Sequence, residues 1–307
     1  MILALLIDDV VQFCNTTYLS YNGLCGCQEG HCNHPSGKCS GSCYDCLYHI
    51  HFPVRAPENA KKKYDCIKML CHYVCQYSYL YASELFCAFD YEWSYLKDFS
   101  CYNILSLGCG GCADLMAIEG LLQSKGSITP VSYMGIDVNN LWHFIHERIK
   151  NYCYNNNMRF KMYYNDVFQF FRTYYVNDVN VIVISYLISY LYNTDQTSLI
   201  NNLAELLTER VITKMKSPCL FIINDVNSNR RGRDYFAVFA NAFRRAGLTI
   251  CKSEYKYFDN GRLNEAQKLG TPYVANTFAF NVPNDIQNNY HAYTSSNSTV
   301  QLLVEVK

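Results

Sequence analysis

The residues best suited to chemistry lie in a glycine-rich turn in the middle of the chain. Gly108, Gly110 and Gly111 follow the apolar run Ile104–Leu107 and precede a stretch that we expect to be helical. Glycines at a strand-to-helix turn let the backbone approach a ligand closely, and the new helix directs its amide hydrogens at that ligand. A second apolar run ends in the acid Asp137. Strand, glycine turn, helix, strand and acid form the layout of a pocket for a nucleotide-type cofactor.

A second group of reactive side chains is a cysteine-rich segment near the N-terminus, in which histidines are interspersed. Thiolates and imidazoles at such short spacings can close a tetrahedral Zn²⁺ site. Metal binding then replaces the apolar core that the segment lacks. We therefore predict zinc here. The predicted ligands are Cys25, Cys27, Cys32, Cys39, Cys43 and Cys46, with His31, His34, His49 and His51 nearby.

Two other interpretations of these cysteines stay open. Cys39, Cys43 and Cys46 have the spacing of the iron–sulfur motif of radical S-adenosylmethionine enzymes. Those enzymes build a barrel after the motif, whereas a helical stretch and the glycine turn follow it here. The second interpretation is that the cysteines hold no metal and are small apolar side chains.

Charge and composition narrow the range of partners and compartments. The 307 residues carry 26 basic and 26 acidic side chains, so no net charge favours a nucleic-acid or an acidic partner. No run of about 18 apolar residues occurs, so we expect no membrane span. We see no secretory signal, and the 17 cysteines suit a reducing compartment. We therefore expect a cytoplasmic protein.

The elements that position the glycine turn alternate between strand and helix patterns from Tyr102 onward. This alternation predicts an α/β fold with a parallel sheet and crossover helices. Two later β-rich stretches predict an antiparallel closure and a total of seven strands. The predicted strands are 103–107, 133–137, 159–164, 180–185, 219–224, 248–258 and 299–306, with an extra strand considered at 274–280; the predicted helices are 112–123, 141–152, 167–175, 195–214 and 233–246.

Outside this alternation the patterns differ. Residues 60–98 lack Gly and Pro and repeat apolar side chains at helical spacing, which predicts a helix. Its tyrosines, Tyr73, Tyr77, Tyr81 and Tyr95, would form either core or a lid over a planar substrate. Residues 23–53 are too irregular for a regular element, and residues 284–299 are predicted to be a mobile loop. We divide the chain into a zinc segment with a helical cap, residues 1–98, and a cofactor-binding domain, residues 99–307.

Three features together resemble class I S-adenosylmethionine-dependent methyltransferases. The sequence Leu107-Gly-Cys-Gly110 is similar to the first motif of that family, a further acid follows the third strand, and the elements end in a C-terminal β-hairpin. The resemblance covers roughly residues 100–307. It implies a Rossmann-like, seven-stranded, mostly parallel sheet, to which the helical, Cys-rich and metal-binding N-terminal extension is added. Ser106 and Cys112 depart from the family pattern, which often has an acid and a glycine there.

The resemblance also implies S-adenosylmethionine as the cofactor and a set of residues that bind it. The glycine turn would contact the methionyl part, the acid of the second strand the ribose, and the acid after the third strand the adenine. The pair after the fourth strand would line the wall beside the sulfonium. The implied residues are Gly108, Cys109, Gly110, Asp137, Asp166, Ser185 and Tyr186. Helix capping is the alternative role of both aspartates, because a helix is predicted after each of them.

We therefore expect methyl transfer to an acceptor that the sequence does not identify; RNA, protein and a small molecule all stay open. A general base is needed only where the acceptor must lose a proton, and Tyr186, Asn224 and Asp225 are candidates. A second hypothesis is a zinc-containing nucleic-acid-binding protein with a non-catalytic sheet domain. A third is an NAD(P)-dependent oxidoreductase, because Gly108-x-Gly110-x-x-Ala113 also fits the dinucleotide fingerprint.

Overall fold

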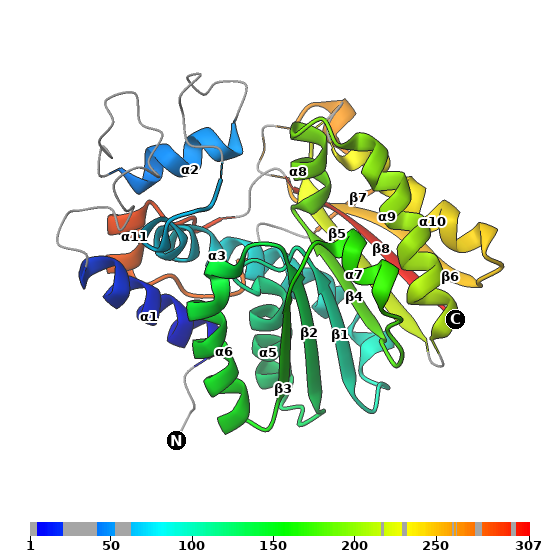
Figure 1. The fold of residues 1–307 in the computed structure, drawn as a ribbon, viewed down its shortest axis with the longest axis horizontal. Coiled ribbons are helices and arrows are strands. Elements are labelled where there is room, and N and C mark those ends of the chain that lie inside the picture. The colour runs from blue at the N-terminus through cyan, green and yellow to red at the C-terminus, as the bar shows by residue number, and fades with distance from the viewer. Residues whose placement is uncertain are drawn as a thin grey trace.

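A computed structural model describes residues 5–20, 42–52, 63–215, 218–228, 232–259, 261, 263–273, 278–295 and 299–307. Its centre is an eight-stranded sheet with the order β3-β2-β1-β4-β5-β8-β6-β7 (Figure 1). The strands are β1 (Tyr102–Leu107), β2 (Val131–Asp137), β3 (Arg159–Tyr164), β4 (Val181–Ser185), β5 (Cys219–Val226), β6 (Ile250–Tyr257), β7 (Thr271–Pro272) and β8 (Thr299–Val306).

The strands after β1 are added first on one side of it, as β2 and β3, and then on the other side, as β4 and β5. This strand order confirms the predicted α/β crossover fold. β1 pairs in parallel with β2 on one side and with β4 on the other. Strands β1 and β4 are buried over most of their length, which explains their nearly continuous apolar sequences. The carboxyl ends of β1 and β4 therefore form the switch point at which open α/β sheets bind ligands.

The sheet differs from the prediction in two respects. It has eight strands instead of seven, because Thr271 and Pro272 pair with Lys256 and Tyr257. In addition, β8 pairs antiparallel with both β5 and β6, so β6 runs in the direction of the first five strands. A two-residue edge strand that ends in proline carries too little pattern to be found in the sequence.

Helices cover both faces of the sheet (Figure 1). The apolar cluster on one face includes α1 (Leu6–Ser20), α3 (Ile67–Tyr91), α5 (Ala113–Lys125) and α6 (His143–Asn155). The cluster on the other face includes α7 (Val167–Thr173), α8 (Leu187–Asn193), α9 (Thr197–Arg210) and α10 (Phe236–Arg245). In the part of the chain that the structure describes, no helix is both long enough and apolar enough to cross a bilayer.

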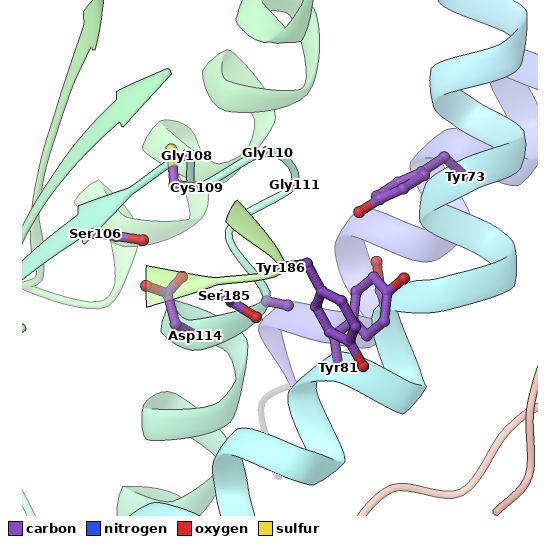
Figure 2. Close-up of a pocket in the computed structure, with 12 residues that line it drawn as sticks. Tyr73, Tyr81, Ser106, Gly108, Cys109, Gly110, Gly111, Asp114, Ser185 and Tyr186 are labelled. Atoms are coloured by element: carbon purple, nitrogen blue, oxygen red, sulfur yellow. The ribbon is translucent and has the colours of Figure 1, made fainter. Parts of the chain in front are cut away.

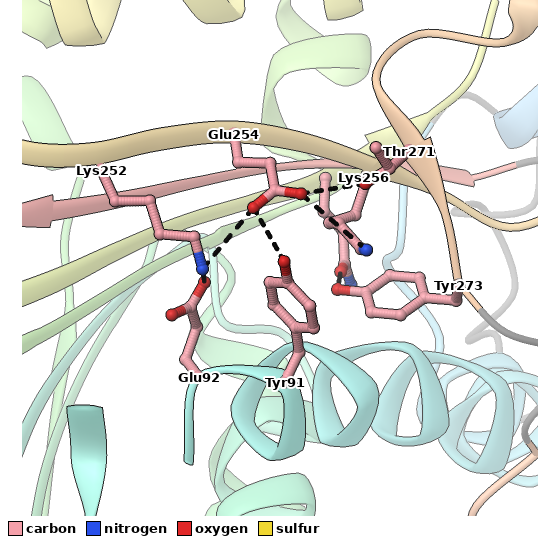
Figure 3. A network of polar contacts seen from close by, with 8 residues as sticks. Tyr91, Glu92, Lys252, Glu254, Lys256, Thr271 and Tyr273 are labelled. Atoms are coloured by element: carbon pink, nitrogen blue, oxygen red, sulfur yellow. Dashed lines mark hydrogen bonds and ion pairs between the residues drawn. The ribbon is translucent and has the colours of Figure 1, made fainter. Parts of the chain in front are cut away.

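Helix α3 connects the far edge of the sheet to the glycine turn. At its C-terminal end, Tyr91 donates a hydrogen bond of 2.9 Å to Glu254, and Lys252 forms an ion pair of 2.8 Å with Glu92 (Figure 3). These contacts tie the helix to β6. Nearer its N-terminal end, Val74 packs against the turn. The division of the chain at residue 98 stays a prediction, and α3 shares one apolar cluster with β1.

Two segments that we predicted to be irregular contain helices. α2 (Cys43–His51) follows Ser42, whose side chain accepts a hydrogen bond from the N–H of Asp45 at 3.1 Å. α11 (Asn284–Tyr290) lies in the predicted mobile loop. Tyr290 is fully buried and donates a hydrogen bond of 2.7 Å to Asn15 of α1. Burial against the N-terminal helices therefore overrides the polar composition of this segment. Part of the extra strand considered at 274–280 lies outside the described residues, and residues 278–280 form no strand.

Candidate active site

The glycine turn follows β1 and has the backbone conformation that its glycines permit. Gly108 and Gly110 have φ angles of +65° and +47°, in the left-handed region that other residues rarely adopt. The N–H of Gly108 donates a hydrogen bond of 2.8 Å to the carbonyl of Ile136 on β2. The turn is therefore fixed against the neighbouring strand, and α5 begins directly after it.

Asp137 lies beside this turn. Its Oδ2 accepts a hydrogen bond of 2.9 Å from the N–H of Gly110, and its Oδ1 accepts one of 2.8 Å from the N–H of Asn139. Burial raises the pKa of the Asp137 carboxyl, and these backbone donors oppose the rise. The structure thus brings the predicted acid and the predicted turn together. A carboxylate accepts about four hydrogen bonds, so acceptor capacity for further donors is left.

The turn borders a small, partly open cavity of about 40 Å³ (Figure 2). Five of the seven predicted cofactor-binding residues line it, and Asp137 contacts one of the five. The seventh, Asp166, does not line it. The cavity-lining residues are Tyr73, Ser78, Tyr81, Ser106, Gly108, Cys109, Gly110, Gly111, Ala113, Asp114, Ser185 and Tyr186.

Aromatic side chains of α3 fill the space beside the turn. The rings of Tyr81 and Tyr186 are 4.2 Å apart, and those of Tyr73 and Trp142 are 5.6 Å apart. Trp142 also covers Gly110, because a Cβ added to that glycine would lie 3.6 Å from the indole ring. Among the tyrosines predicted as either core or lid, Tyr73 and Tyr81 are partly buried and border the cavity, and Tyr77 is buried. Tyr95 lies beyond α3 and donates a hydrogen bond of 3.4 Å to the carbonyl of Val306 on β8.

Asp114, which the sequence analysis did not single out, provides a buried carboxylate at the cavity. Its Oδ1 accepts a hydrogen bond of 2.9 Å from the hydroxyl of Tyr133. Its Oδ2 is buried and lacks a hydrogen bond of normal geometry to the described residues. Burial raises the pKa of this carboxyl to about 7. An incompletely paired buried carboxylate next to a cavity suits a cationic ligand group.

Glu84 of α3 is a second buried acid that the sequence analysis missed. Its Oε2 accepts hydrogen bonds from the hydroxyl of Tyr186 at 2.8 Å and from the side chain of Asn224 at 3.0 Å. Its Oε1 accepts one from Thr299 at 2.6 Å. Burial raises the pKa of Glu84 to about 7, although these donors oppose the rise. A charged residue inside an otherwise apolar helical run was the signal that could have revealed it.

Tyr186 connects this network to the cavity. It has a φ of +55°, an uncommon conformation for a residue with a side chain, and its N–H donates a hydrogen bond of 2.8 Å to the carbonyl of Asn224. Ser185 accepts a hydrogen bond of 3.3 Å from the side chain of Asn224. The ends of β4 and β5 therefore hold both predicted wall residues.

Asp166 and Asp225 cap helices. Asp166 accepts hydrogen bonds from the N–H groups of Phe168 and Gln169 at the start of α7. Asp225 is fully buried and accepts the N–H of Ser189 in α8 at 2.9 Å. The capping role that we considered for Asp166 is thus present, and its role beside adenine stays a prediction. Asp225 thus accepts a backbone donor at the start of α8, and its role as a general base stays a prediction.

The predicted zinc ligands fall mostly outside the described residues, as Cys25, Cys27, Cys32 and Cys39 do. Cys43 and Cys46 are described and lie on α2, where both are buried in an apolar cluster with Leu47 and Met69 of α3. The prediction of zinc in this segment is not confirmed. His31 and His34 also lie outside the described residues.

The strand order, the antiparallel β8 and the glycine turn after β1 agree with the Rossmann-like sheet that the resemblance implied. No protein-family model matches the chain, and no curated protein matches its sequence. The resemblance therefore concerns the fold.

Solved structures with a similar arrangement are distant in sequence. The plantazolicin methyltransferase BpumL, bound to a desmethylplantazolicin analogue and SAH, has 14% identity and a TM-score of 0.41 over 85% of this chain and 94% of its own. An S-adenosylmethionine-dependent methyltransferase from Clostridium acetobutylicum has 8% identity and a TM-score of 0.41 over 86% and 99%. The pyocyanin biosynthetic protein PhzM has 11% identity and a TM-score of 0.40; the match covers 85% of this chain but only 61% of PhzM.

Proposed function

We propose that the chain is an S-adenosylmethionine-dependent methyltransferase. The observation that carries the proposal is the meeting of the positive-φ glycine turn and Asp137 at the switch point of the sheet. Asp137 uses two backbone donors and keeps acceptor capacity for a ribose diol. Asp114 supplies an incompletely paired carboxylate that suits the ammonium group of the cofactor.

The two carboxylates beside the turn fit this cofactor, but the cavity is too small to hold it. Small-molecule pockets usually measure about 300–1,000 Å³, whereas the cavity beside the turn measures about 40 Å³. Tyr73 and Tyr81 border the cavity and occupy the adjoining space. We infer that this arrangement is a closed state and that α3 must move its tyrosines before the cofactor binds.

Each predicted site residue has a role in this proposal. The backbone from Gly108 to Gly110 would lie against the methionyl part of the cofactor, and Asp166 would approach the adenine. Ser185 and Tyr186 would form the wall beside the reacting centre. When bound, the cofactor supplies a methyl group on a sulfonium, which leaves readily, so the protein mainly aligns the acceptor.

Glu84 and Tyr186 would handle the proton where the acceptor must lose one. The Tyr186 hydroxyl already donates a hydrogen bond to Glu84. When the Tyr186 oxygen takes a proton from the acceptor, its own hydroxyl proton can therefore pass to the Glu84 carboxylate. A buried carboxyl with a pKa of about 7 can accept a proton near neutral pH.

Calorimetric titration of the full chain with S-adenosylmethionine and its demethylated product, S-adenosylhomocysteine, tests this proposal, with NADH titrated in parallel. We expect both adenosyl ligands to bind, and we expect Asp137→Ala to weaken binding by roughly 1.5–3 kcal/mol, because a charged acceptor is lost. Asp98→Ala, which removes an exposed acid, is the control. Binding of NADH alone, or unchanged affinity of the Asp137 variant, would contradict the proposed pocket.

A further inference from the structure

At the glycine turn, two cysteines and one histidine converge. One sulfur each from Cys109 and Cys112 and one ring nitrogen of His146 all lie within 4.8 Å of one another. Cys112 is fully buried, and His146 is 1% exposed. This cluster is separate from the cysteine-rich N-terminal segment, because the cysteines belong to the turn and the histidine belongs to α6.

The turn itself brings the two sulfurs together. The N–H of Cys112 donates a hydrogen bond of 2.8 Å to the carbonyl of Cys109, which closes a tight four-residue turn. Cys112 has a φ of +61°, although glycine would adopt this conformation at lower cost. A cysteine at a position that favours glycine is explained if its sulfur binds a ligand.

The sheet leaves room for the sulfur of Cys109. A Cβ added to Gly135 of β2 would lie 2.8 Å from this sulfur and 2.5 Å from the sulfur of Met162. Any larger residue at position 135 would therefore clash with both sulfurs. Figure 2 shows the side chain of Cys109 directed away from Tyr81 and Tyr186.

The histidine is held in place by polar contacts at both nitrogens. Nδ1 of His146 lies 2.9 Å from the hydroxyl of Tyr164, and Nε2 lies 2.7 Å from the carbonyl of Gly110. Histidines that bind metals usually keep a hydrogen bond at the second nitrogen, which orients the ring. The nitrogen that binds the metal ion gives up its present contact, and the contact at the other nitrogen keeps the ring oriented.

We propose that Cys109, Cys112 and His146 bind one thiophilic metal ion, for which Zn²⁺ is the probe. Two thiolates and an imidazole are donors that Zn²⁺ prefers, and three protein ligands leave the fourth tetrahedral position to water. Two Zn–S bonds and one Zn–N bond form, and any thiol protons are released to solvent. The ion would hold the turn at both of its cysteines. This inference does not depend on the proposed methyl transfer.

Metal analysis of the full chain tests the site. We expect the double variant Cys112→Ser/His146→Ala to contain one zinc ion per chain fewer than the wild type. Cys219→Ala, which removes a buried cysteine of β5, should keep the wild-type content. The comparison measures a difference, so zinc bound by the N-terminal cysteines does not affect it. Equal zinc content in the wild type and a folded double variant overturns the proposal.

A measurement on the wild type decides the question even if the double variant does not fold. Zn²⁺ added to chelator-treated protein should slow the alkylation of Cys109 and Cys112 at least tenfold, as read by peptide mass mapping. Cys251, which is exposed, should react at the same rate throughout. Alkylation that does not respond to Zn²⁺, or a Cys109–Cys112 disulfide in the native protein, overturns the proposal.

Discussion

The hydroxyl of Tyr186 donates a hydrogen bond of 2.8 Å to Glu84, a residue 102 positions earlier in the chain. This bond joins the middle of α3 to the end of β4. Glu84 is fully buried, and its carboxylate accepts hydrogen bonds from Tyr186, which directly follows β4, and from residues of β5 and β8. It is therefore the centre of the polar contacts at this end of the sheet. The stability of the closed arrangement therefore depends on the protonation of one side chain.

Glu84 should make the stability of the protein depend on pH. Burial raises the pKa of Glu84 from its ordinary value of 4.5 to about 7 in the folded protein, so the folded state holds the proton more tightly. The stabilisation is present below pH 4.5 and is lost as the pH rises through 7, by at most about 3 kcal/mol. Glu84→Gln should remove this dependence in urea unfolding at pH 5 and pH 8. The exposed Glu265→Gln is the control, and an unchanged pH dependence in the Glu84 variant would show that this carboxyl does not titrate in that range.

Tyr81 should limit access to the cofactor site. Tyr81→Ala removes a ring 4.2 Å from Tyr186 and widens the space beside the turn. Because opening the cavity then costs less free energy, we expect S-adenosylmethionine to bind roughly tenfold more tightly, which corresponds to about 1.4 kcal/mol. Tyr81→Phe keeps the ring and should stay close to the wild type. If calorimetry finds no gain for the alanine variant, Tyr81 does not close the site.

Gly135 should tolerate no side chain. Gly135→Ala places a methyl group within 2.8 Å of two sulfur atoms, in a buried part of β2. Overpacking of this kind costs about 1–3 kcal/mol of stability. Ser132→Ala on the same strand, where the side chain is only half-buried, is the control. Denaturant unfolding measures both, and equal stability of the two variants would mean that the sulfurs move aside freely.

The ion pair between Lys252 and Glu92 should contribute to stability. Lys252→Ala leaves the carboxylate of Glu92 buried, at 2% exposure, without its cation. Because Lys252 is partly exposed, we expect a loss of about 1–3 kcal/mol, less than for a fully buried pair. Lys268→Ala, which breaks an exposed pair with Glu265, should change stability by less than about 0.5 kcal/mol. Comparable losses in both variants would show that the burial of Glu92 has little effect.

The elements with strong local patterns were predictable from the sequence. Residues 159–164 and 299–306 were predicted as strands with the bounds that the structure gives them. The glycine turn and Asp137 were also found, because a strand-to-helix turn with several glycines is a local signal. The structure places them together through the bond between Asp137 and Gly110.

The remaining features depend on contacts between distant parts of the chain. α11 was missed because Asn-rich sequence predicts a loop, and the burial of Tyr290 beside α1 is visible only in three dimensions. Glu84 has no local motif, since its partners come from β4, β5 and β8. The aromatic closure of the cavity likewise depends on how α3 crosses the turn. Sequence patterns describe elements, but they do not give the distances between them.

The anchoring of α3 has a mechanical consequence. One end of this helix is tied to β6 by Glu92 and Tyr91, and its other half packs against the glycine turn through Val74. Close-packed interiors transmit displacement instead of absorbing it. A displacement of α3 at β6 would therefore also displace Tyr73 and Tyr81, which border the cavity.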